Sequence, residues 1–549
     1  MKTTRLLLAL AATACLRADE GMWTFDNVPV KRIKASLGVD VDQAFLDRLR
    51  LATVRFPGAT GSFVSPEGLV LTNHHVGRGA IQQVSSAEHD YIRDGFMAVD
   101  RDHELKVPGL VLVTLEKMRD VTKEMAAAAK PGLAPAAARK AKEAALLALQ
   151  QAEQKATGLQ VESVSLYNGG ETWLYGYKRH TDVRLVAAPE AQMAAFGGDP
   201  DNFVYPRHDL DFSLFRVYEN GKPYQPAAFL PFAAAGAQAG DPVFISGHPG
   251  ATARQETLAQ MAFARDLSVP FNLKSWKRRR EALLRHGATS TEARRLVSDQ
   301  VYGLENNLKR WEGFLRTLRD ADNWARLEKQ EAELKAAVAK QGGRAATASF
   351  EAIAKAVARE RAMMKERALV GTLSSQTLAF ALALHQAEAE RAKPSEQRLA
   401  EFSDARLKAT EARILNPKAI DRGVDQALML NALQEAQELL GKDHPFVKAV
   451  LGGRSPEEVV RVTFRDTRLT DVEERKEVWE RGQGHATDAM LNLARAIDPF
   501  VRKLRKGYED EVESVFKEQG GRLAQQRFAL YGHEAYPDAT LTLRLAYGK

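Results

Sequence analysis

The fold of this chain is decided by residues 61–75, which read Gly-Ser-Phe-Val-Ser-Pro-Glu-Gly-Leu-Val-Leu-Thr-Asn-His-His. An apolar strand leads into a Ser-Pro-Glu-Gly turn, in which proline and glycine stand at favoured positions. A second apolar strand then ends at His74 and His75. The stretch predicts a β-hairpin that holds a histidine on a rigid scaffold, where an imidazole can act as a general base. A buried histidine pair satisfied by hydrogen bonds is the alternative interpretation.

The hairpin lies within a β-like region that extends from residue 53 to about residue 242. Short apolar runs, such as residues 68–72 and 109–114, are separated by glycine, proline and aspartate. This spacing favours a barrel or sandwich of short strands. One helical patch, at residues 134–156, interrupts the pattern.

Beyond about Asp266 the composition changes to long segments of Ala, Leu, Glu, Lys and Arg, which predict helices as far as about Tyr531. One stripe of apolar residues recurs at intervals of three and four and lines one face of a helix, so it predicts core packing rather than a cofactor site. The stripe consists of Leu304, Leu308, Trp311, Leu315 and Leu318. The expected breaks between helices are Gly342-Gly343, Lys393-Pro394 and Gly452-Gly453.

A β pattern returns at residues 540–545, which read Thr-Leu-Thr-Leu-Arg-Leu and alternate like a half-buried strand. We therefore predict an α+β protein in which a β domain is split by a helical insertion. The expected boundaries are residues 1–18 for a signal peptide, 19–265 for the first part of the β domain, 266–532 for the inserted α-helical domain and 533–549 for the start of a second β part.

The first 18 residues have the features of a secretory signal, with basic residues before an apolar stretch and Ala18 at the cut. Cys15, the only cysteine, lies inside this segment, so we expect neither a disulfide nor thiol chemistry in the mature protein. Lipid attachment at Cys15 is the alternative. No later run approaches the roughly 20 apolar residues of a transmembrane helix, so we expect an exported protein without an integral membrane segment.

The charge pattern does not favour a nucleic-acid partner. The formal net charge is +7, and the basic cluster at residues 277–280 lies among alternating charges, which is typical of solvated helices. His533 and Glu534 begin like a zinc motif of the His-Glu-x-x-His type but lack the second histidine. No phosphate-binding, haem or redox motif occurs, so we expect neither a metal nor a cofactor.

The hairpin resembles the histidine motif of trypsin-like serine peptidases, in which Gly-Ser-x-x-Ser-x-x-Gly precedes a strand that ends in Thr-x-x-His. His75 falls where the catalytic histidine stands in that motif. Val76 occupies a position where many relatives have cysteine, so a disulfide of those relatives is absent here without a consequence for the mechanism.

Five segments in order resemble the bacterial family of dipeptidyl peptidases 7 and 11 and dipeptidyl aminopeptidase BII. They are residues 19–23 (Asp-Glu-Gly-Met-Trp), 72–75 (Thr-Asn-His-His), 196–218 around Asp-Asn-Phe-Val-Tyr-Pro-Arg-His-Asp-Leu-Asp-Phe-Ser, 246–250 (Ser-Gly-His-Pro-Gly) and 536–540 (Tyr-Pro-Asp-Ala-Thr). The resemblance implies a chymotrypsin-like double β-barrel interrupted by a large helical domain. It also implies release of dipeptides from peptide N-termini in the periplasm or at the cell surface of a Gram-negative bacterium, by a homodimer.

On this resemblance His75 is the catalytic base and Asp211 is the carboxylate that orients it. Asp209 is the competing candidate, and Asp211 is preferred because it directly precedes Phe212-Ser213 as in the family pattern. For either aspartate, a surface residue with no catalytic part is the alternative.

The same resemblance implies a pocket that holds the amino group of the substrate. Asn202 matches an asparagine of that pocket, whereas Phe203 replaces a tryptophan, which keeps an aromatic face but removes an indole N–H. Asn306 resembles an asparagine of the helical domain that reaches the same amine, although a solvated helix residue is the alternative. Arg207 is expected to brace the site.

A nucleophile motif of the type Gly-Asn-Ser-Gly, Gly-Asp-Ser-Gly or Gly-x-Ser-x-Gly does not occur in the 549 residues. The family carries its serine after the strand that begins here at Thr540, so we expect a truncated second barrel and a serine beyond Lys549. The alternatives are a catalytically inactive protein that binds peptide N-termini and an endopeptidase of the trypsin-like type.

Overall fold

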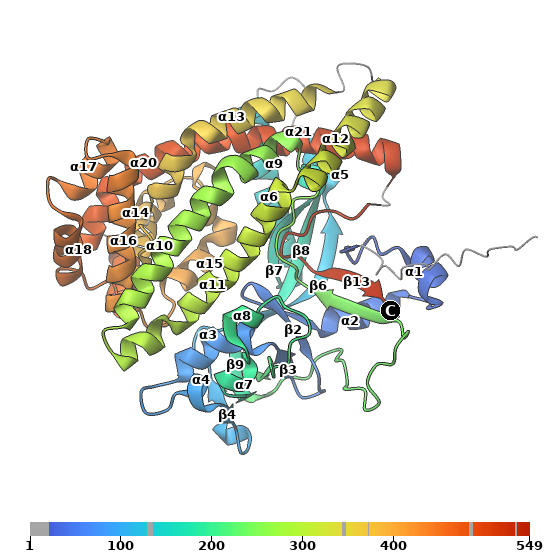
Figure 1. Cartoon of the computed structure of the whole chain (residues 1–549), viewed down its shortest axis with the longest axis horizontal. Coiled ribbons are helices and arrows are strands. Elements are labelled where there is room, and N and C mark those ends of the chain that lie inside the picture. The colour runs from blue at the N-terminus through green and yellow to red at the C-terminus, as the bar shows by residue number, and fades with distance from the viewer. Residues whose placement is uncertain (1–20, 129–134, 343–346, 372, 483–486, 533–534) are drawn as a thin grey trace, which may run out of the picture.

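The computed structural model describes residues 21–128, 135–342, 347–371, 373–482, 487–532 and 535–549 (Figure 1). The expected signal peptide with Cys15, and the pair His533 and Glu534, lie outside these ranges. Strands come mainly from the first half of the chain and helices from the second. In the part of the chain that the structure describes, no helix is long and apolar enough to cross a membrane.

The first half forms one large antiparallel sheet. Its strands lie in the order β4-β9-β10-β3-β2-β1-β6-β8-β7, with β11 paired to β10 and β5 to β9. The bounds are β1 Thr53–Phe56, β2 Ala59–Phe63, β3 Leu69–Thr72, β4 Phe96–Met97, β5 Leu105–Lys106, β6 Leu112–Asp120, β7 Gln160–Leu166, β8 Glu171–His180, β9 Asp182–Ala188, β10 Ser213–Glu219 and β11 Lys222–Pro223. Short strands that alternate with turns were the expectation for this half.

The predicted hairpin is strands β2 and β3, which pair antiparallel with Phe63 opposite Val70. Both side chains are fully buried, so the hairpin is anchored in the core. Gly68 has a φ of +68°, and a Cβ there would lie 2.8 Å from the carbonyl oxygens of Val217 and Tyr224. The turn therefore requires glycine for its conformation and for space.

The two histidines do not end a strand as predicted. Strand β3 stops at Thr72, and helix α3 (His74–Val84) starts directly after it. His74 and His75 are therefore the first two residues of a helix. The apolar residues of this segment continue at helical spacing, with Ile81 fully buried, and this signal lies after the stretch from which the hairpin was predicted.

Two strands that are distant in the sequence form a second, smaller sheet. Strand β12 (Val243–Gly247) pairs antiparallel with β13 (Arg544–Gly548), and the two lie side by side (Figure 1). The strand predicted for residues 540–545 begins only at Arg544. The reason is local, since Leu541 has a φ of +58° and so leaves the extended conformation.

Eight α-helices of the described residues lie before β12 in the sequence. They are α1 Val30–Leu37, α2 Gln43–Ala52, α3, α4 Tyr91–Asp94, α5 Thr122–Ala128, α6 Pro135–Thr157, α7 Ala191–Ala194 and α8 Gly198–Asp201. Helix α6 confirms the helical patch that was expected at residues 134–156.

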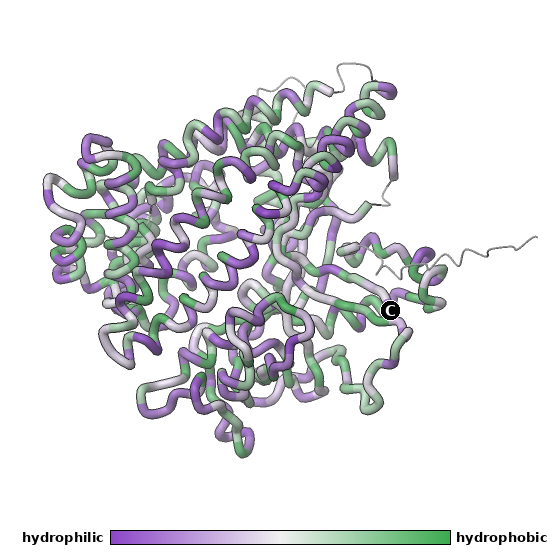
Figure 2. Tube along the Cα trace, viewed as in Figure 1, coloured by the Kyte–Doolittle hydropathy of each residue, from purple (hydrophilic) through white to green (hydrophobic). Residues whose placement is uncertain are grey.

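The other α-helices of the described residues lie between β12 and β13 in the sequence. They are α9 Leu258–Phe263, α10 Val269–Gly287, α11 Thr291–Arg319, α12 Ala321–Gly342, α13 Ala348–Leu369, α14 Gln376–Arg391, α15 Asp404–Ile414, α16 Arg422–Leu440, α17 Pro445–Leu451, α18 Pro456–Arg465, α19 Val472–Arg481, α20 Ala489–Tyr508 and α21 Ser514–Tyr531. Hydrophobic and hydrophilic residues alternate at short intervals along them, as expected for helices with one buried face (Figure 2). The predicted breaks are confirmed, because α12, α14 and α17 end at or just before them.

The predicted apolar stripe lies on α11. Leu304, Leu308, Leu315 and Leu318 are at most 9% exposed. Trp311 packs against the cluster that contains Leu308 and Leu315. The stripe is therefore a packing surface, as the sequence indicated.

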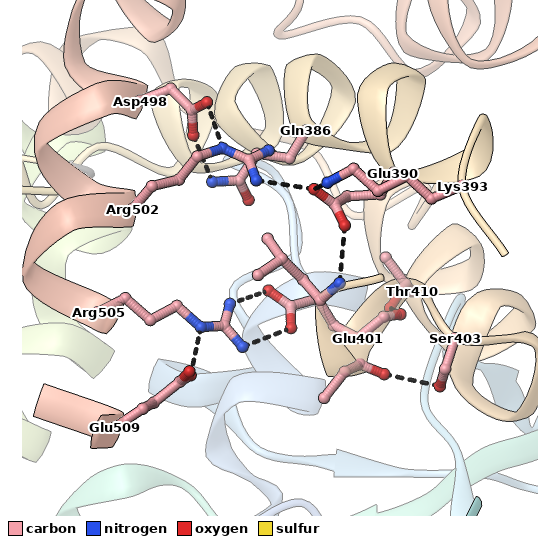
Figure 3. Close-up of polar contacts among 12 residues, drawn as sticks. Gln386, Glu390, Lys393, Glu401, Ser403, Thr410, Asp498, Arg502, Arg505 and Glu509 are labelled. Atoms are coloured by element: carbon pink, nitrogen blue, oxygen red, sulfur yellow. Dashed lines mark hydrogen bonds and ion pairs between the residues drawn. The ribbon is translucent and has the colours of Figure 1, made fainter. Parts of the chain in front are cut away.

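Ion pairs tie α20 to α14 and to the segment that follows α14 (Figure 3). Arg505 donates to both carboxylate oxygens of Glu401, at 2.6 and 3.0 Å, and to Glu509 at 2.7 Å. Arg502 bridges Asp498 and Glu390, at 2.6 and 2.7 Å. The contacts with Glu401 and Glu390 cross between elements, so they help to fix how the helices are placed relative to one another.

Candidate active site

His75 and Asp211 meet where α3 and β10 begin. Strands β3 and β10 pair with Thr72 opposite Ser213, so the residues next to this pair are brought together. The His75 Nδ1 lies 2.6 Å from the Asp211 Oδ2, and the His75 backbone N–H donates to Oδ1 at 2.9 Å. One carboxylate therefore holds both the ring and the main chain of His75.

The carboxylate of Asp211 has further support. Asn73 Nδ2 donates to its Oδ2 at 3.2 Å and to the Asp211 carbonyl at 3.1 Å. Burial raises the pKa of Asp211, but the hydrogen bonds from the His75 ring and backbone outweigh it and leave this pKa below its ordinary value. Asp211 is thus an ionised acceptor for Nδ1–H.

The other ring nitrogen of His75 is available for chemistry. The His75 side chain is 47% exposed, and within the described ranges no hydrogen bond to Nε2 is found. When Nδ1–H donates to Asp211, Nε2 carries the lone pair. This is the tautomer that a general base requires.

Asp209, the competing candidate, is directed elsewhere. Its Oδ2 lies 2.9 Å from Nε of Arg207. Of the two aspartates, Asp211 is the one in contact with His75.

His74 differs from its neighbour. It is 1% exposed, and burial, aided by the nearby Arg78 cation, lowers its pKa to about 4. Its Nε2 has no hydrogen-bond partner in the described part of the chain. The alternative of a buried pair satisfied by hydrogen bonds therefore does not describe these residues, since His74 is buried with an unpaired Nε2 and the His75 side chain is 47% exposed.

The residues expected to hold a substrate amine also come together. Asn202 Nδ2 donates to Asn306 Oδ1 at 3.0 Å, which joins the loop after α8 to α11. Arg207 Nη1 donates to Asn202 Oδ1 at 3.3 Å, so Arg207 contacts both Asn202 and Asp209. Phe203 is 64% exposed, with a φ of +63°.

The side of α11 that carries Asn306 also contacts helix α3, which begins with His74 and His75. The guanidinium carbon of Arg78 lies 5.4 Å from the Tyr302 ring centroid. Burial raises the pKa of the Tyr302 hydroxyl, and the charge of Asp211 raises it further. The pair His75 and Asp211 and the contact between Asn202 and Asn306 therefore lie in the same region of the molecule.

Asn73 and Ser213 lie within the sequence motifs but were not predicted as site residues. Asn73 supports Asp211, and Ser213 Oγ donates to the Asn73 carbonyl at 3.0 Å. The only sequence signal that could have identified them was their position next to the histidines and the aspartate.

No group of three or more His, Cys, Asp or Glu side chains suited to a metal ion is found among the described residues. The contacts at His75 are those of a base held by a carboxylate. This arrangement can accept a proton at Nε2 and stabilise the imidazolium that forms.

Known proteins share both the sequence and the fold. Dipeptidyl-peptidase 7 of Phocaeicola vulgatus is 34% identical over 62% of this chain, and the matched part is about half of that relative's length. The Asp/Glu-specific dipeptidyl-peptidase of Porphyromonas endodontalis is 28% identical over 99% of the chain and 80% of its own length. The crystal structure of Porphyromonas endodontalis DPP11 in complex with the dipeptide Arg-Asp superposes with a TM-score of 0.75, at 23% identity, over 96% of this chain and 79% of that one.

The family model for peptidase S46 matches residues 18–549. This match includes the hairpin, the histidine and aspartate pair, and the helices between β12 and β13. The chain therefore belongs to the peptidase S46 family.

Proposed function

We propose that the whole protein is a serine dipeptidyl peptidase that releases dipeptides from peptide N-termini, with His75 as base and Asp211 as the residue that orients it. The observation that carries the proposal is the 2.6 Å contact between His75 and Asp211, in which the His75 side chain is 47% exposed. The names of the relatives, dipeptidyl-peptidase 7 and Asp/Glu-specific dipeptidyl-peptidase, support the same activity.

In the proposed mechanism a serine hydroxyl attacks the second peptide bond of the substrate while Nε2 of His75 takes its proton. Asp211 stabilises the resulting imidazolium and keeps Nδ1 protonated. His75 then returns the proton to the leaving amine, and water hydrolyses the acyl-enzyme by the same route. Because the 549 residues contain no nucleophile motif of the expected kind, we assign the serine and its oxyanion hole to residues outside this sequence.

An exopeptidase must count residues from the substrate amine. The side-chain oxygens of Asn202 and Asn306 are the proposed acceptors for the ammonium group, and Arg207 holds Asn202 in place. Phe203 borders this position and offers an aromatic face in place of an indole.

The wider organisation is part of the proposal. The large sheet would belong to the first barrel of a chymotrypsin-like pair, and β12 with β13 would start the second. Residues 266–532 would form the inserted domain. We further propose export to the periplasm or cell surface after removal of residues 1–18, and a homodimer.

The test uses protein expressed from the complete gene and a panel of fluorogenic dipeptidyl substrates. We expect cleavage when the first residue has a free amine, no cleavage when that amine is acetylated, and loss of activity in His75→Ala. Cleavage of acetylated peptides would indicate an endopeptidase instead. Binding of free N-termini with no cleavage of any substrate would indicate the inactive binding protein.

A further inference from the structure

The carboxylate of Glu305 lies on α11, one residue before Asn306 of the proposed amine site. Residues Tyr302, Glu305, Asn306 and Lys309 are spaced by three and four along α11, so they share one side of the helix. The contacts of Asn306 with Asn202, and of Lys309 Nζ with the Asp199 and Pro200 carbonyls at 2.5 and 3.1 Å, place this side against the loop around α8. Glu305 directly precedes the first of these contact points and lies about one helical turn before the second.

Asp209, Asp211 and Lys309 each have a partner other than Glu305. Asp209 pairs with Arg207, Asp211 accepts from His75, and the Lys309 ammonium is bound by two carbonyls. The carboxylate of Glu305 is half-buried, and in the described residues no hydrogen bond or ion pair to it is found.

The electrostatic surroundings agree with an unpaired charge. Burial raises the pKa of Glu305, and the nearby Asp199 raises it further, while Arg280 opposes both from beyond ion-pair distance. A half-buried carboxylate in such a position gains free energy when a ligand supplies a cation.

We propose that Glu305 determines specificity by binding the cationic side chain of a substrate whose first residue is lysine or arginine. The inference rests on the proposed function, because it takes Asn202 and Asn306 as the acceptors of the amino group. Glu305 precedes Asn306 by one residue, so its side chain projects about 100° away around the helix. The proposed partner of Glu305 is therefore the side chain of the first substrate residue and not its amino group.

The test measures binding of dipeptides by titration calorimetry, so it does not depend on turnover. Arg-Ala and Lys-Ala are compared with norleucine-Ala, which has a similar length and no side-chain charge. We expect the unaltered protein to bind the basic dipeptides about tenfold more tightly, equivalent to about 1.4 kcal/mol. Glu305→Gln should reduce this preference to less than about twofold, and Glu305→Lys should reverse it.

Glu312→Gln is the matched control, because Glu312 lies on the same helix and pairs with Lys277 at 2.7 Å. This variant should keep the preference. The proposal is overturned if Glu305→Gln keeps it too, or if that variant weakens norleucine-Ala as much as Arg-Ala. Hydrolysis measured in parallel separates the two proposals: an active peptidase without the charge preference contradicts only the inference, whereas the preference without hydrolysis contradicts only the peptidase.

Discussion

At the scale of single residues, the proposed chemistry depends on which carboxylate holds His75. Asp211→Asn replaces an obligate acceptor with an amide that can present N–H to Nδ1, which favours the wrong tautomer of the ring. We expect kcat/KM for dipeptidyl substrates to fall by about 10⁴-fold, the loss known for the equivalent change in a serine peptidase triad. The measurement is steady-state hydrolysis by protein from the complete gene.

Asp209→Asn is the comparison for this change. It removes the partner of Arg207 but leaves His75 untouched, so we expect a loss of at most about tenfold, mainly in KM. Equal losses in the two variants would remove the distinction between the aspartates.

Single residues also show where sequence reasoning stops. The hairpin motif identified the pair of histidines, but burial separates them, and burial depends on α3 packing against β10. Gly77 illustrates this packing, because a Cβ there would lie 2.5 Å from Ser213 Oγ. The contact between Asn202 and Asn306 joins residues that are distant in the sequence, and it was anticipated only through resemblance.

At the scale of elements, the helices between β12 and β13 are joined by charged groups as well as by apolar faces. Arg505→Met would leave Glu401 without its bidentate partner, and this carboxylate is only 34% exposed. We expect a loss of about 2 kcal/mol, because a partly buried charge would be left uncompensated. Scanning calorimetry should show a lower melting temperature.

The double variant Arg505→Met/Glu401→Leu removes both charges. It should recover part of the lost stability, since replacing a whole ion pair costs less than breaking it. A double variant that is less stable than Arg505→Met would show that the pair is not the source of the effect.

Elements were the most predictable level of this structure. Long helices have a repeated apolar face, so the stripe on α11 and the breaks after α12, α14 and α17 could be read directly. The strand near the end of the chain was placed too early because one residue, Leu541, adopts a left-handed conformation that its apolar character does not signal. Strand propensity is judged from the side chain, whereas Leu541 leaves the strand because of its backbone conformation.

At the scale of the whole molecule, a polar seam connects the two sheets. Ser246 Oγ lies 2.7 Å from Thr53 Oγ1, and the His248 backbone N–H donates to Thr60 Oγ1 at 2.7 Å. The His248 ring contacts the same hydroxyl through Nδ1 at 3.2 Å. The Ser-Gly-His-Pro-Gly motif therefore holds β12 against β1 and β2.

This seam should make stability depend on pH. Burial lowers the pKa of His248 to about 3, whereas an unfolded histidine has a pKa of about 6.5. As the pH falls from about 6.5 towards 4, the unfolded chain binds a proton that the folded protein excludes, so folding loses stability, on the order of 3 kcal/mol from this residue. His248→Asn keeps a polar atom near Nδ1 and should lose less, which melting temperatures across this pH range would measure.

An exposed histidine provides the control for the pH experiment. His89→Asn, on the surface between α3 and α4, should follow the unaltered protein throughout. If His248→Asn follows it as well, the seam does not contribute to acid sensitivity.

The pairing of β12 with β13 also constrains the order in which the protein can be made. The two strands are about 300 residues apart, and a ribosome adds about 5–20 residues per second. In the nascent chain β12 therefore remains unpaired with β13 for roughly 15–60 s, until β13 has been synthesised. During that interval the intervening helices can already pack on one another, so the chain would close its smaller sheet around a preassembled insert.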